Sequence, residues 1–144
     1  ETMEKIPVAT ISSWVPLAAG VPTKKMAQRM AEVLATDSWQ TPLPIPTVDS
    51  KDVRWKSNSF WRGDVWPSTN YQIVSGLAAY GHTELAAMIS DKTVENAIKN
   101  GISEHYDSVS GKPLGVKDYC MSATIATMML DGLTKQYQLK QRIR

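Results

Sequence analysis

Prolines restrict where helices can form in this chain. Pro42, Pro44 and Pro46 lie close together within residues 36–59, a stretch that has few regularly spaced apolar side chains. Proline lacks a backbone N–H and clashes with the preceding helical turn, so this stretch cannot be a continuous helix. Long segments without regular structure are uncommon in compact domains and are often functional. We therefore expect an irregular connection with helical regions on either side.

Apolar residues recur at helical spacing on both sides of this connection. The helix starts are expected at a Thr23 cap, at Pro67 or Ser68, at a Thr83 cap and at an Asp118 cap. The predicted helices cover residues 23–34, 67–81, 83–100 and 118–133. Alternation of apolar and polar residues, which is typical of a half-buried strand, is nearly absent. The sequence predicts an all-α fold, in which αα-hairpins are joined by long loops.

Composition excludes several classes of protein. The chain has 144 residues, 42% hydrophobic and 21% charged, which suffices for one domain with a core. The formal net charge is +2, and the basic cluster in residues 135–144 is weak evidence for a nucleic-acid surface. The sequence has no apolar run of about 18 residues that could span a membrane. We expect neither a nucleic-acid nor a membrane partner. Because the sequence begins at Glu1 inside what reads as continuing sequence, we expect a piece of a longer protein.

The sequence FWRGDVWPSTNY concentrates aromatic and polar side chains just before a predicted helix start. Trp61 and Trp66 flank Arg62, Gly63 and Asp64. Indole rings offer flat apolar faces, and backbone donors at a helix start are free to bind a ligand. This combination suits a sugar, which has apolar C–H faces and a rim of hydroxyls. The alternative is that the tryptophans fill the core while Arg62 and Asp64 form a local ion pair.

The sequence NGISEHYDSVSGKPLG holds a second group of candidate residues. Glu104 follows the helix-ending Gly101, on an expected loop that turns through Asp107. A carboxylate on such a loop can reach a cleft between helices, although a simple surface glutamate is the alternative. His82 and His105 show no metal-ligand pattern, so surface or core positions are expected for them. We expect neither a metal nor a cofactor.

Together these stretches resemble the C-terminal region of the (α/α)6-toroid glycosidases. The likeness is greatest to glycoside hydrolase family 63, including its mannosylglycerate and glucosylglycerate hydrolases, and weaker to the trehalases of family 37. It is carried by FWRGDVWPSTNYQIVSGLAAYG, NGISEHYDSVSGKPLG and YCMSATIATMMLDGL, and with ISSWVPLAAGVPTKKMAQRMAEVL it covers roughly residues 10–134. The resemblance implies that residues 1–144 are the C-terminal portion of an (α/α)6 catalytic domain.

The resemblance also implies roles for individual residues. Glu104 falls on the family's general base, which deprotonates the water that attacks the anomeric carbon and so inverts its configuration. Asp64 replaces the proline that is common at its position. The residues that fall on the sugar-pocket turn are Phe60, Trp61, Arg62, Gly63 and Trp66. Inversion needs a second carboxyl group about 6.5–9.5 Å away. Nothing in this sequence matches the aspartate that serves as the family's general acid, which is expected upstream of Glu1.

Two other functions remain open from the sequence. The chain could be a non-catalytic carbohydrate-binding module or pseudoenzyme, or a structural helical domain that mediates assembly. The expected partners are a carbohydrate substrate and either the remainder of the toroid or another copy of the chain. Either would cover the apolar helix faces that an isolated piece leaves exposed.

Overall fold

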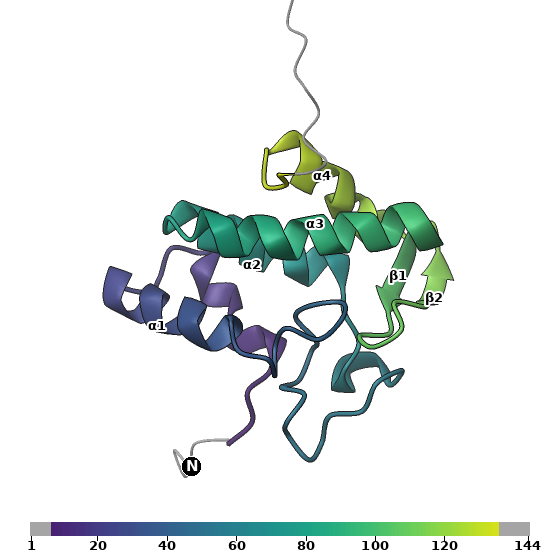
Figure 1. Ribbon diagram of the computed structural model, residues 1–144, viewed down its shortest axis with the longest axis horizontal. Helices are drawn as coiled ribbons and strands as arrows, with labels where there is room; N and C mark the ends of the chain where they lie inside the picture. The colour runs from purple at the N-terminus through teal and green to yellow at the C-terminus, as the bar shows by residue number, and fades with distance from the viewer. Residues whose placement is uncertain (1–6, 136–144) are drawn as a thin grey trace, which may run out of the picture.

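A computed structural model describes residues 7–135 (Figure 1). The helices are α1 (Lys24–Leu34), α2 (Pro67–Ala79), α3 (Thr83–Asn100) and α4 (Thr124–Leu130), and the strands are β1 (Ser103–Tyr106) and β2 (Pro113–Lys117). Short 3-10 turns cover Ile11–Ser13, Val15–Leu17, Phe60–Arg62 and Cys120–Ala123. Nearly all of the basic cluster, from residue 136 onward, lies outside the described residues. Within residues 7–135, no helix has both the length and the apolar character needed to cross a membrane.

The first helices begin where local sequence predicts. The Thr23 hydroxyl accepts a hydrogen bond from the Met26 N–H at 3.3 Å, which caps α1. Pro67 is the first residue of α2, where its missing N–H has no partner to lose. Thr83 is the first residue of α3 rather than its cap, because His82 occupies the cap position.

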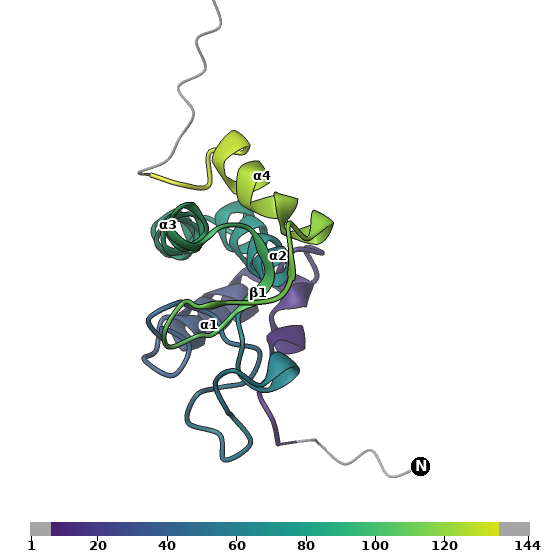
Figure 2. The ribbon, with the colours of Figure 1, turned by 90° about the vertical axis from the view of Figure 1, so that its right-hand side faces the viewer.

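A hairpin of α2 and α3 forms the centre of the molecule. Gly81, at a φ of 89°, reverses the chain between the two helices in a left-handed conformation that glycine favours. Figure 2 shows α4 lying across both helices. Their facing residues form the main core, which includes Ile73, Val74, Leu77, Ile89, Val94, Ile125 and Met128.

The proline-containing connection is irregular, as predicted, and part of it is buried. Trp39 and Ile45 are fully buried in the main core. The Thr47 N–H donates to the Asp64 carbonyl at 3.0 Å, and the Ile11 N–H donates to the Thr47 carbonyl at 2.9 Å. The connection therefore links the N-terminal turns to the segment that precedes α2.

The strict all-α prediction is wrong for residues 103–117, because β1 and β2 form an antiparallel hairpin beside the end of α3 (Figure 1). Ser103, His105 and Tyr106 of β1 are all buried, so the strand lacks the apolar–polar alternation that marks a strand with one wet face. The fold is mostly helical with a small two-stranded sheet.

The start of the last helix also differs from the prediction. Asp118 does not cap it: this residue has a φ of 53° and ends the hairpin by donating its N–H to the Ile102 carbonyl at 2.9 Å. A 3-10 turn at Cys120–Ala123 follows, and α4 begins only at Thr124. The residues after the hairpin are therefore fixed by strand contacts before the helix starts.

Candidate active site

A backbone pairing joins the two stretches that the sequence singled out. The Val65 N–H donates to the Tyr106 carbonyl at 2.8 Å, and the Tyr106 N–H donates to the Val65 carbonyl at 2.9 Å. Both side chains are fully buried and pack with Leu43. The aromatic turn therefore lies directly beside the strand that carries Glu104.

A stack of rings lies on the opposite side of this pairing, because neighbouring residues in extended backbone point to opposite faces. The rings of Trp61 and Trp66 are parallel within 7°, with centroids 4.1 Å apart, and Trp66 stacks in turn on His105 at 4.8 Å and 15°. Phe60 meets Trp66 edge-on at 5.0 Å. Trp66 is only 4% exposed whereas Trp61 is 44% exposed. One aromatic face is thus held at the surface by rings packed beneath it.

Gly63 and Arg62 shape the turn in different ways. A Cβ on Gly63 would lie 2.5 Å from the Lys56 carbonyl oxygen and 2.9 Å from Nε1 of Trp55, so only glycine fits this close approach. The exposed Arg62 donates from Nε to the Arg54 carbonyl at 3.4 Å. The ion pair that the sequence suggested between Arg62 and Asp64 is not formed, because the Asp64 carboxylate is turned inward to other partners.

The Asp64 carboxylate contacts two backbone amides and a histidine. Asp64 is fully buried and accepts hydrogen bonds from the N–H groups of Ser59 at 3.1 Å and Phe60 at 2.6 Å. Its Oδ2 lies 3.0 Å from Nδ1 of His105, at ion-pair distance but outside hydrogen-bond geometry. Burial raises the pKa of Asp64, against the lowering effect of the two amides and of His105, while Asp107 raises it further.

Glu104 is half-buried on β1, opposite an irregularity in β2. Ser103 pairs with Lys117 whereas His105 pairs with Leu114, so Gly115 and Val116 together lie opposite Glu104. The Val116 N–H donates to Oε2 of Glu104 at 3.1 Å. The carboxylate is therefore held by the backbone of the bulge.

Gly115 provides the space for this carboxylate. It has a φ of 70°, and a Cβ there would collide with the Glu104 carboxylate and lie 2.9 Å from Cδ2 of His105. Both side chains consequently lie against the same face of Gly115. Since His105 also stacks on Trp66, the carboxylate is next to the aromatic stack.

Ser122 holds β1 from another direction, whereas Asp107 organises the hairpin turn that follows the strand. The buried Ser122 hydroxyl donates to the Ser103 carbonyl at 2.7 Å, which ties β1 to the start of the last helical segment. Asp107 accepts from Ser110 N–H at 2.6 Å and Oγ at 2.8 Å, and from Val109 N–H at 3.1 Å. Burial raises the pKa of Asp107, but the hydrogen bonds outweigh burial, so the net pKa lies below its ordinary value.

Sequence reasoning missed the positioning roles of Gly115 and Ser122 and the contact between Asp64 and His105. A glycine following Pro113 and Leu114 was a weak sign of a bulge. For the other residues the sequence offered no local signal, since their partners lie far away along the chain.

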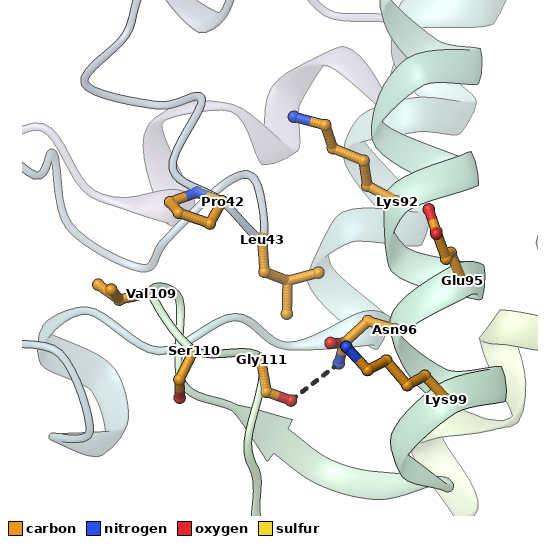
Figure 3. Close-up of a pocket in the computed structure, with 9 residues that line it drawn as sticks. All are labelled: Pro42, Leu43, Lys92, Glu95, Asn96, Lys99, Val109, Ser110 and Gly111. Atoms are coloured by element: carbon orange, nitrogen blue, oxygen red, sulfur yellow. Dashed lines mark hydrogen bonds between the residues drawn. The ribbon is translucent and has the colours of Figure 1, made fainter.

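Two cavities of the described chain lie away from this site. Figure 3 shows one of about 190 Å³ between α3, the proline-containing connection and the hairpin tip, where Asn96 donates to the Gly111 carbonyl at 3.1 Å. A second, of about 170 Å³, adjoins residues 132–135. Neither is lined by Glu104 or by a tryptophan. Within residues 7–135, no cluster of three or more His, Cys, Asp or Glu side chains could hold a metal ion.

Comparisons with known proteins agree on one family. The model of the mannosylglycerate hydrolase MGH1-like glycoside hydrolase domain matches residues 1–122. Mannosylglycerate hydrolase MGH1 of Selaginella moellendorffii is 33% identical over 134 residues, which is 93% of this chain and 27% of that protein.

Solved structures give the same result. The GH63 mannosylglycerate hydrolase of Thermus thermophilus in complex with glucose superimposes with a TM-score of 0.80 and 29% identity, over 85% of this chain and 31% of that chain. The same enzyme in complex with Tris and D-glycerate gives the same TM-score and identity, over 85% of this chain and 30% of that chain.

This chain spans less than a third of the length of each of these relatives. The resemblance to family 63 seen in the sequence is confirmed. Because the family model matches most of its residues, the protein belongs to the mannosylglycerate hydrolase MGH1-like glycoside hydrolase domain family.

Proposed function

We propose that this chain supplies the general base and part of the sugar-binding surface of an inverting glycoside hydrolase that acts on an α-linked glucoside or mannoside. The observation that carries the proposal is the pairing of Val65 with Tyr106, which brings the aromatic turn beside the strand of Glu104. Family membership and the mannosylglycerate hydrolases among its relatives support the substrate class. The glucose and D-glycerate complexes of the Thermus thermophilus enzyme favour a hexose joined to glyceric acid.

In this mechanism the aromatic turn binds the sugar. The exposed face of Trp61 packs against the C–H face of the sugar ring. Phe60 and Trp66, whose rings contact Trp61, hold the Trp61 ring in place. The Arg62 guanidinium donates to hydroxyl groups at the rim of the ring. Gly63 lets the turn pack close enough to Lys56 for these side chains to share one surface.

Glu104 then activates water. Its Oε2 accepts the Val116 N–H, which leaves Oε1 to take a proton from a water molecule. The water oxygen forms a bond to the anomeric carbon on the face opposite the aglycone as the glycosidic C–O bond breaks. A carboxylic acid from another part of the catalytic domain protonates the departing oxygen. That group must lie about 6.5–9.5 Å from Glu104.

We also infer that residues 1–144 are the C-terminal portion of an (α/α)6 catalytic domain. This placement is supported by the helical hairpin, by the similarity to a family 63 enzyme and by the small share of that enzyme that is matched. The apolar side chains Ile102, Val116, Met121 and Leu130 are exposed in the described chain. In the complete domain, the remaining helices cover them.

The substitution Glu104→Gln in the full-length protein tests the base assignment. We expect kcat for an α-mannosyl or α-glucosyl glycerate to fall by about 10²–10⁴-fold, because an amide cannot take the proton from water. Sugar binding, followed by tryptophan fluorescence, should survive. Glu95→Gln is the matched control, since Glu95 is exposed on α3 and should leave kcat unchanged.

The outcomes separate the alternative functions. Normal turnover in Glu104→Gln would remove the base assignment, and an NMR assay of the first-formed anomer checks inversion. Sugar binding by the wild-type protein without hydrolysis would favour a binding module. A protein in which no sugar perturbs tryptophan fluorescence would favour a structural role.

A further inference from the structure

We propose that Asp64 and His105 form a positioning pair that fixes the Trp61–Trp66 stack relative to the strand carrying Glu104. The two residues come from the separate stretches joined by the backbone pairing. Their side chains are 0% and 7% exposed, and Oδ2 of Asp64 lies 3.0 Å from Nδ1 of His105. The pair forms an ion pair when His105 is protonated. A buried carboxylate is costly unless polar partners surround it, so this contact constrains both partners.

Asp64 determines the shape of the turn. Asn58 and Phe60 have φ values of 55° and 54°, in the left-handed region that a bulky side chain rarely adopts. The Asp64 carboxylate accepts the N–H of Phe60 and that of the preceding Ser59. These hydrogen bonds offset the strain at Phe60, and Trp61 follows directly in the chain. The position of Trp61 therefore depends on the Asp64 side chain.

His105 contacts both the Trp61–Trp66 stack and the strand pair that holds Glu104. One face of its ring stacks on Trp66, and Phe60 meets the ring edge-on at 5.2 Å. Its Cδ2 edge lies against Gly115, beside the Glu104 carboxylate. Among the described residues, Nε1 of Trp66 has no hydrogen-bond partner, so ring packing alone orients that indole. A change in the His105 ring would therefore move Trp66.

The effect on catalysis rests on the function proposed above, whereas the effect on the aromatic stack does not. Indoles stacked 4.1 Å apart couple their electronic transitions, and the resulting circular dichroism couplet depends on the skew between their in-plane transition dipoles. The difference spectrum between wild type and Trp61→Phe assigns this signal to the stack. The couplet of full-length variants can be compared with their kcat, KM and Tm. A failure to detect hydrolysis would leave the couplet to decide this inference.

The variants are Asp64→Asn, which removes the charge, and His105→Phe, which retains a stacking ring but loses Nδ1. We expect each to reduce the assigned couplet by about half or more and to lower kcat about tenfold, with a smaller change in KM, because small displacements of reacting groups cost rate steeply. The double variant should lose little more than either single variant, since the two residues act as a unit. Asp107→Asn is the matched control: it removes another buried carboxylate nearby and should lower Tm without changing the couplet.

An unchanged couplet in folded Asp64→Asn and His105→Phe would overturn the inference, and so would additive losses in the double variant. A couplet lost equally in Asp107→Asn would also overturn it, because general loosening would then explain the result. If Asp64→Asn does not fold, His105→Phe alone decides the matter, since its ring still fills the space between Trp66 and Gly115.

Discussion

Two tryptophan pairs in this chain show how the same residue can serve different purposes. Trp14 and Trp39 meet edge-to-face, with centroids 5.2 Å apart at 87°, and both are buried among the helices. Trp61 and Trp66 lie parallel at 4.1 Å, with Trp61 substantially exposed. The first pair belongs to the main apolar core, whereas the second is supported by a strained turn, a buried carboxylate and a histidine. Apolar packing determines the first arrangement, whereas ring packing together with hydrogen bonds to the backbone of the turn determines the second.

The largest expected effect comes from emptying the core pair. Trp39→Ala should lower the free energy of unfolding by about 3–5 kcal/mol, because a fully buried indole leaves a cavity that cannot collapse completely. Denaturant titration of the full-length protein measures this. A loss below about 1 kcal/mol would show that Trp39 does not support the core, and the contrast between the two pairs would fail.

The second prediction concerns the space beside Gly115 that the Glu104 carboxylate occupies. Gly115→Ala should lower kcat by about 100-fold, because the added methyl group displaces the Glu104 carboxylate. Gly20→Ala is the matched control: Gly20 has a φ of 67°, similar to the 70° of Gly115, but no atom lies within 4 Å of its added Cβ. Both variants should lose about 1–2 kcal/mol of stability from backbone strain.

The two variants should share this loss of stability, but only Gly115→Ala should also lose turnover. Equal activity in the two glycine variants would mean that the space beside Glu104 is irrelevant to the reaction.

A third, smaller effect separates binding from folding at the aromatic turn. Trp61→Ala should weaken sugar binding about tenfold, which corresponds to about 1.4 kcal/mol. It should lower the free energy of unfolding by less than about 1 kcal/mol, since the ring is partly exposed. Calorimetric titration and denaturation of the same variant test both statements. A stability loss comparable to that of Trp39→Ala would assign Trp61 to the core instead.

The smallest effect is the pH dependence of the buried aspartates. The lowered pKa of Asp107 contributes stability above the ordinary pKa of 3.8, and this contribution is lost as pH falls through the lower folded value. The raised pKa of Asp64 works in the opposite sense: its contribution is present below 3.8 and is lost as pH rises through the folded value.

Denaturation of the wild type, Asp107→Asn and Asp64→Asn between about pH 3 and pH 6 separates the two aspartates. Relative to the wild type, Asp107→Asn should lose its disadvantage as the solution becomes more acidic. Asp64→Asn should show its greatest disadvantage there. Parallel curves for all three proteins would contradict both directions.

Local chemistry made the early helices predictable. A threonine cap, a proline at the first helical position and a glycine after Asn100 act within a few residues, so their effects can be inferred without knowing the fold. The mostly helical character of the chain and the family resemblance are confirmed, whereas the predicted caps at Thr83 and Asp118 are wrong. The roles of Glu104 and of the aromatic turn came from that resemblance, and they stay predictions.

The hairpin could not be predicted in the same way. β1 is held by Val65 on one side and by Ser122 on another, and Ser103, His105 and Tyr106 are buried although they point to different faces of the strand. Hydrophobic periodicity detects a strand only when one face is wet. The contact between Asp64 and His105 was hidden for a related reason, since only the backbone pairing brings these residues together.

The bulge opposite Glu104 fixes the number of residues that β2 holds between Leu114 and Lys117. Removing one residue between Leu114 and Lys117 would restore a regular ladder and take away the amide that now meets the carboxylate. The tip of the hairpin lies beyond this point and is free of that restriction. Natural or designed variation in length should therefore accumulate at the tip, while the distance from the bulge to the strand end stays constant.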